Sequence, residues 1–246
     1  MTLPDQVLHP LFGSLTYDSP MVEVVSVRDL EAAEVSAAVD LHEQVLSEEF
    51  ISQAGTAFLR AYYRAWLRAE GGLALAAVDP EGRLTGVLLG GLDPALHYRT
   101  MLRRDGWRLA GLMLVQAGRR PSFGRALVVT RGMRYSRGLG RMAWGRIRHR
   151  VPELGGGAAD RPAIGATTGE VTHILVDPTR QGEGIGRSLV FAAVEAGRQS
   201  GLTRLSLVTT PELAASGFYE RLGWVSRGDM SSRSGEQFRR YDFICS

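Results

Sequence analysis

The sequence predicts an α/β (α+β) protein in which helices flank a mixed central sheet. One observation behind this prediction is the stretch 169–201, where a strand pattern, a glycine-rich loop and a helical pattern follow one another. The second is an earlier run of one strand, two helices and a β-hairpin. With 246 residues, of which 44% are hydrophobic, the chain is long enough for one large domain with a core.

The first elements follow from apolar alternation and helical spacing. Residues 21–27 alternate enough for a strand, and Asp29 fits the N-cap of a helix that extends to about residue 46. A second helix is expected from about residue 52 to 69, because apolar residues and arginines fall on different sides of it. Its apolar side, which we expect in the core, holds Phe58, Tyr62, Ala65 and Trp66.

The later elements are marked by turn residues. Residues 73–78 and 84–89 form a hairpin across a turn that contains Pro80 and Gly82. A strand over 171–176 stops at Asp177-Pro178, and the helix after the loop ends at Gly201, where a left-handed residue is needed. Residues 1–20 contain three prolines and little periodicity, so we expect an N-terminal arm.

The loop between this strand and helix contains Gly182, Gly184 and Gly186, and it suits phosphate groups. Successive backbone N–H groups lie exposed there, just where a helix presents its positive end. A tight turn with close packing is the alternative interpretation. A dinucleotide-binding turn is disfavoured because the third glycine comes one residue early. A phosphate-loop NTPase is excluded because the chain contains no lysine.

Two motifs carry a resemblance to the GNAT (Gcn5-related) N-acetyltransferases. The run 181–186, Gln-Gly-Glu-Gly-Ile-Gly, is similar to the pyrophosphate loop of that family, Gln/Arg-x-x-Gly-x-Gly/Ala. The run 215–224 resembles the family element Ala-x-x-Phe-Tyr-x-x-x-Gly-Phe, with Trp224 in the last position. The motifs cover about 169–230, with a looser likeness over 21–92. The resemblance implies the GNAT acyl-CoA N-acyltransferase fold, with six to seven strands, as a single domain over 21–246.

The resemblance also implies acetyl-CoA as co-substrate, with no metal. Ile174, Leu175 and Val176 would pair with the pantetheine arm through their backbone. The pyrophosphate would be held by Gln181, Gly182, Glu183, Gly184, Ile185 and Gly186. Arg180 and Arg187 are placed to meet the phosphates by charge-assisted bonds, and their alternative is ordinary surface charge.

For the chemistry, acyl transfer to an amine needs a base, an oxyanion donor and an acid for the thiolate. Glu170 matches the position of a glutamate that deprotonates the amine in many family members; the alternative is a solvated strand-end carboxylate. His173 is the second candidate base, and a packed strand residue is its alternative. The resemblance gives Tyr219 the role of acid and the Val176 N–H that of polarising the thioester carbonyl, whereas packing on the sheet is the alternative for Tyr219. Glu212 departs from the family, which often has Asn there, so pantetheine contacts near it are in doubt.

An insertion over residues 93–168 separates the expected third and fourth strands. It holds fifteen arginines against four acidic residues, a net charge of +11, whereas the whole chain carries only +3. A helix is expected over 96–117, with a glycine linker at 155–159. The insertion is interpreted as a helical flap, as a site for an anionic acceptor, or as a basic contact with an anionic membrane surface. Nucleic acid is disfavoured because no binding motif accompanies the charge.

These observations predict an acetyl-CoA-dependent N-acetyltransferase that transfers an acetyl group to a primary amine by direct attack in a ternary complex. The alternative is a catalytically inactive acyl-CoA-binding sensor or assembly module. The acceptor, a small molecule or a protein amine, and the oligomeric state are left open. Cys245 is the single cysteine, no signal peptide opens the sequence, and no run is apolar enough to span a bilayer, so we expect a cytoplasmic protein.

Overall fold

A computed structural model describes residues 25–127, 168–210, 216–231 and 237–245. Its seven strands form one sheet in the order β1-β2-β3-β4-β5-β7-β6. Only β4 and β5 run parallel, and all other neighbours are antiparallel, so the expected mixed sheet of six to seven strands is confirmed. The strands are β1 (Ser26–Asp29), β2 (Gly72–Val78), β3 (Leu84–Gly91), β4 (Thr168–Val176), β5 (Arg204–Thr209), β6 (Val225–Ser231) and β7 (Gln237–Ile244).

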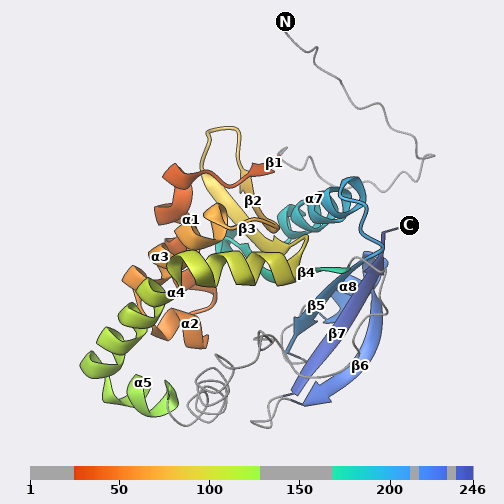
Figure 1. Ribbon diagram of the computed structural model, residues 1–246. Coiled ribbons are helices and arrows are strands. Elements are labelled where there is room, and N and C mark those ends of the chain that lie inside the picture. Colours follow the sequence, from red (N-terminus) through yellow and green to blue (C-terminus); the bar gives the residue numbers. More distant parts are fainter. Residues whose placement is uncertain (1–24, 128–167, 211–215, 232–236, 246) are drawn as a thin grey trace, which may run out of the picture.

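Helices cover both faces of the sheet. Figure 1 shows α1, α3 and α4 on one side of β1–β3 and α7 on the other. The helices and 3-10 turns are η1 (Ala32–Glu34), α1 (Val35–Val45), α2 (Phe50–Gln53), α3 (Thr56–Arg68), α4 (Pro94–Arg119), α5 (Pro121–Ala126), η3 (Pro178–Arg180), α7 (Ile185–Gln199) and α8 (Ser216–Arg221). The predicted hairpin corresponds to β2 and β3. The predicted arm and glycine linker, and residues 21–24 of the first strand, lie outside the described residues.

Two predicted helix boundaries were wrong. Asp29 does not cap a helix, because it is the last residue of β1. The helical segment begins instead after Glu31, where the side chains and backbone of Glu31 and Glu34 satisfy each other in a capping box. The helix expected over 52–69 is two helices, since Gly55 has a positive φ of 89° and separates α2 from α3.

Each face of the sheet has its own core. Strand residues such as Val87 and Leu89 pack with α1, α3 and α4, and their neighbours in sequence, such as Leu88, pack with α7. The expected core residues Phe58, Ala65 and Trp66 are buried, and Tyr62 is partly buried in the same cluster. Close packing of α7 depends on β3, because a Cβ at Gly86 would lie 2.9 Å from an Ile185 side-chain atom.

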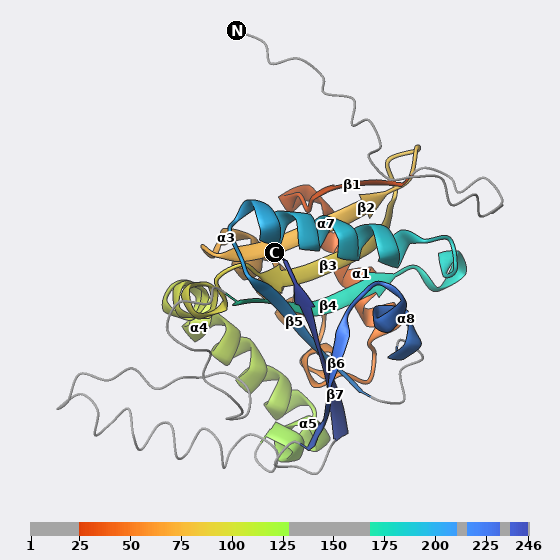
Figure 2. The same ribbon diagram turned by 90° about the vertical axis from the view of Figure 1, so that its right-hand side faces the viewer.

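The first part of the insertion is an integral part of this fold. The helix expected over 96–117 is confirmed as α4, which packs against α3 and buries four residues, His97, Met101, Asp105 and Leu109. An ion pair of 2.7 Å joins the Asp105 carboxylate to Arg68 of α3. Figure 2 shows α4 leading away from the sheet to α5. Among the residues that the structure describes, no helix has both the length and the apolar character needed to cross a bilayer.

Candidate active site

The sheet opens between β4 and β5. Their parallel pairing runs from Thr168–Arg204 only to Val171–Leu207, although β4 continues to Val176 and β5 to Thr209. Figure 1 shows β5, β6 and β7 turning away from the first half of the sheet. The section 172–176 of β4 therefore keeps its ladder with β3 on one edge and faces the opening with the other. An open strand edge can pair with an extended amide chain. This is where Ile174, Leu175 and Val176 were predicted to bind pantetheine.

A glycine loop lies at the end of this open strand. Gly182 and Gly184 have positive φ values of 90° and 83°, and a Cβ built on either would meet nothing within 4 Å. Glycine is thus required there by the backbone conformation and not by crowding. Ser188 is the first residue to donate within α7, to the carbonyl of Gly184 at 3.0 Å. The preceding N–H groups of α7, which form its positive end, have no partner within the helix and suit a phosphate.

The two arginines beside the loop differ in availability. Arg180 donates from Nε to Glu183 at 2.8 Å, and its Nη1 lies 3.4 Å from an oxygen of Asp79. Its side chain is only 14% exposed, so its charge already stabilises the loop against the turn between β2 and β3. Arg187 is exposed, with its guanidinium 5.2 Å from the centre of the Phe191 ring. Arg187 is therefore the more accessible cation for a phosphate, and both predicted contacts stay predictions.

Tyr219 is held in an aromatic cluster on α8. Its ring centre lies 6.0 Å from that of Trp224 and 5.5 Å from that of Tyr241, and the residue is buried. Burial is the main cause that raises the pKa of Tyr219 to about 12. The packing role is therefore real, and the role of Tyr219 toward the thiolate stays a prediction. Glu212, where the sequence departs from the family, lies outside the described residues.

A β-bulge at Thr172 places two candidate bases on the same face of β4. Leu89 pairs with His173 and Gly90 pairs with Val171, so Thr172 is the extra residue; its hydroxyl donates to the carbonyl of Leu89 at 2.9 Å. In a regular strand, residues three apart would point to opposite faces. Here Glu170 and His173 both face the side of α1, α3 and α4.

Glu170 lies where β4 is still paired, opposite Ser206 of β5. Burial raises the pKa of Glu170, although a hydrogen bond from the Tyr98 hydroxyl and the charge of His173 act in the other direction. Its Oε1 atom is buried and has no hydrogen-bond partner among the described residues. The solvated carboxylate that we weighed as an alternative is therefore not what the structure shows. A buried carboxyl with a raised pKa suits proton transfer, and its use as a base stays a prediction.

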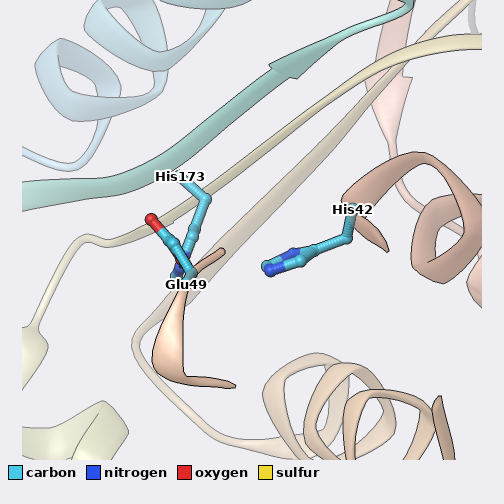
Figure 3. Close-up of side chains that lie close together, drawn as sticks. All are labelled: His42, Glu49 and His173. Atoms are coloured by element: carbon cyan, nitrogen blue, oxygen red, sulfur yellow. The ribbon is translucent and has the colours of Figure 1, made fainter. Parts of the chain in front are cut away.

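His173 belongs to a cluster that the sequence analysis missed. His42 of α1, Glu49 just before α2, and His173 converge, with one ligand-type atom from each within 4.8 Å of the others (Figure 3). Nε2 of His173 lies 3.6 Å from a Glu49 oxygen, and Nδ1 of His42 lies 3.0 Å from the Tyr63 hydroxyl. Only the tertiary fold brings these residues together. The one sequence signal was a histidine at an otherwise apolar position of the first helix.

The site thus combines an open β4 edge, a glycine loop at a helix N-terminus and titratable groups on the adjacent face of the sheet. The sequence profile described as the acetyltransferase (GNAT) family matches residues 40–224. The chain belongs to this family.

Among curated relatives of this GNAT protein is a mycothiol acetyltransferase of Kocuria rhizophila, 41% identical over 69 residues. That match takes in 28% of this chain and 22% of the relative, so the chain spans about a fifth of that protein. Among solved structures, an acetyltransferase of Corynebacterium glutamicum, described as HPA2-related, aligns with a TM-score of 0.53 and 16% identity, over 89% of this chain and 94% of the other.

A second solved structure is a putative acetyltransferase from Salmonella typhimurium, determined with its cofactor acetyl-CoA. It aligns with a TM-score of 0.51 and 14% identity, over 90% of this chain and 94% of the other. At these identities the two structures establish the fold of the GNAT protein. They are consistent with its mixed sheet.

Proposed function

We propose that this GNAT protein is an acetyl-CoA-dependent N-acetyltransferase, which transfers an acetyl group to a primary amine by direct attack in a ternary complex. The observation that carries the proposal is the open section 172–176 of β4, which leads directly into the glycine loop and α7. One continuous stretch thus offers an edge for an extended amide arm and a helix N-terminus for its phosphates.

In this proposal, the coenzyme lies along β4. The backbone of Ile174, Leu175 and Val176 binds pantetheine, and residues 181–186 bind the pyrophosphate, with Arg187 as the accessible cation. The Val176 N–H polarises the thioester carbonyl, as an oxyanion donor must. The Tyr219 hydroxyl donates to the sulfur of the departing thiolate. The acceptor amine approaches from the face of β4 that carries Glu170 and His173, where a proton can be removed.

The test separates catalysis from binding alone. Calorimetry with acetyl-CoA should show one site per chain, and a panel of primary amines should release free thiol in proportion to acetylated product. Saturable binding without thiol release for any amine would favour the alternative, an inactive acyl-CoA-binding module. Absence of binding would contradict both functions.

A further inference from the structure

His173 lies closer to the predicted thioester than Glu170 does. It belongs to the unpaired section 172–176, whereas Glu170 is still paired with β5. Measured along the strand, His173 is three residues from Val176 and Glu170 is six, or roughly 10 Å against 20 Å at about 3.3 Å per residue. A base must come within hydrogen-bond reach of the amine, directly or through one water.

The environment of His173 distinguishes its two ring nitrogens. Nε2 lies 3.6 Å from a Glu49 oxygen, slightly longer than a hydrogen bond, and the Glu49 side chain is 44% exposed. Nδ1 is buried and has no hydrogen-bond partner among the described residues. Nε2 therefore has a carboxylate neighbour, whereas Nδ1 is without a partner in the described part of the chain and can meet an acceptor only through a bridging water or after neighbouring side chains shift.

We propose that His173 is the general base of the acetyl transfer, with Nδ1 as the proton acceptor and Glu49 as the carboxylate that orients its ring. This inference rests on the proposed function. A carboxylate accepts the Nε2–H, which leaves the lone pair on Nδ1, and it stabilises the imidazolium that forms. Glu49 suits this role. Burial acts to raise its pKa, but the hydrogen bond and charge of His173 and the charge of His42 together lower it, so the carboxylate is charged.

His42 is the wrong histidine for this task. It is fully buried, and desolvation lowers its pKa to about 4, with the charge of His173 acting in the same direction. Its Nδ1 is engaged with the Tyr63 hydroxyl. His42 thus stays neutral and packs beside His173, with the two ring centres 5.3 Å apart.

The same cluster offers three ligand-type atoms that could hold a metal ion. A zinc ion binds histidine nitrogen and carboxylate oxygen at about 2.0–2.2 Å, so its tetrahedral ligands lie roughly 3.5 Å apart. Here the three ligand atoms lie within 4.8 Å of one another. A metal site at this place is therefore an outcome that the experiment must detect, and not the proposal.

The proton balance is simple. An ammonium acceptor loses one proton to Nδ1 of His173, which later releases it to solvent. The neutral amine then attacks, so the nitrogen–carbon bond forms and the carbon–sulfur bond breaks. The second N–H proton, lost as the tetrahedral intermediate collapses, balances the proton that the thiolate takes up.

Four variants and one control test the inference. His173→Gln should lower kcat/KM for the acceptor about 100-fold, since a positioned base contributes 10²–10⁴-fold, and should leave coenzyme A binding unchanged. Glu170→Gln should lower kcat/KM for the acceptor far less. Glu49→Gln should lower kcat while leaving the KM for acetyl-CoA unchanged, because the ring of His173 loses the carboxylate that orients it. Glu49→Asp, which keeps a carboxylate, should restore part of that kcat. Glu48→Gln, an exposed neighbour, is the matched control.

The titratable groups that face His173 are Glu49, His42, Tyr62 and Glu170. Tyr63 lies behind His42, and Tyr98 lies beside Glu170. A large loss in Glu170→Gln together with near-normal turnover in His173→Gln would assign the base to Glu170. An unchanged kcat in Glu49→Gln, or no recovery in Glu49→Asp, would remove the orienting role. If a chelator abolished wild-type activity and Zn²⁺ or Mn²⁺ restored it, the cluster would be a metal site instead. If wild-type protein bound acetyl-CoA and acetylated no amine, the proposed function itself would fail, and the base with it.

Discussion

Tyr219 holds its proton more tightly than a free tyrosine does. Its pKa of about 12 lies well above the value near 8.5 of an ordinary thiol. Full proton transfer from Tyr219 to a thiolate is therefore uphill by about 5 kcal/mol in the described surroundings. A hydrogen bond from the phenol to the sulfur has no such cost. We expect Tyr219 to stabilise the departing thiolate in this way.

Tyr219→Phe should lower kcat ten- to a hundredfold and leave the KM for acetyl-CoA nearly unchanged, because the hydrogen bond forms only as the thiolate leaves. Steady-state kinetics on folded protein measures this. Tyr241→Phe is the control, since it removes a hydroxyl from a neighbouring buried ring that donates to Glu220 at 3.4 Å. Equal losses in both variants would indicate a packing effect and leave Tyr219 without a catalytic role.

Single residues were predictable from sequence where a local motif fixes them. The positive φ values of Gly182, Gly184 and Gly201 follow from a loop and a helix end that lie within one short stretch. The shared face of Glu170 and His173 was not predictable, because the bulge at Thr172 interrupts the rule that successive side chains of a strand point to opposite faces. The local sequence near residue 49 does not indicate that Glu49 contacts His173 of β4.

The two ends of α7 allow the phosphate loop to be tested without confusing it with backbone strain. Gly184 at the first end and Gly201 beyond the last both have positive φ, and neither would meet an atom within 4 Å of an added Cβ. Alanine at either site should cost about 1–2 kcal/mol of stability, the usual cost of a left-handed residue with a Cβ. Only Gly184→Ala changes the surface that is predicted to face the coenzyme.

We expect Gly184→Ala to weaken coenzyme A binding at least tenfold and Gly201→Ala to leave it unchanged, with similar losses in the free energy of unfolding. Calorimetry and urea unfolding give the two quantities. If both variants bound coenzyme A with wild-type affinity, the pyrophosphate would not lie on this loop.

Whole elements were predicted best where turn residues mark the ends of a helix or strand. The observed hairpin of β2 and β3 and the observed unit β4–α7 agree with the predicted elements, because Pro and Gly mark their turns. The helix α1 begins later than expected, since Glu31 and Glu34 supply a better cap than Asp29. The helical pattern over 52–69 conceals a break at Gly55, because side-chain periodicity carries no information on a positive φ.

At the level of the whole molecule, the described part of the insertion is packed into the fold through α4. The described helix α4 carries exposed arginines at positions 99, 103, 104, 108 and 119, and it also completes one of the two cores. The composition of the insertion pointed to its charge, and it did not show that Met101 and Leu109 are buried against the sheet side of the fold. An anionic acceptor or an anionic membrane surface as partner of these arginines stays a prediction.

Two leucines of α4 measure how far this helix belongs to the cooperative core. Leu109 is buried at 7% exposure, whereas Leu114 is 67% exposed. Leu109→Ala should lower the free energy of unfolding by about 2–5 kcal/mol, the range for leucine in a packed core, because it removes contacts and leaves a cavity. Leu114→Ala, the same chemical change one and a half turns later, should alter it by less than about 0.5 kcal/mol. Urea unfolding followed by circular dichroism and by coenzyme A binding should give one transition in both variants. If Leu109→Ala were as stable as Leu114→Ala, α4 would be an appendage, and deletion of residues 93–168 would then leave a folded coenzyme-binding protein.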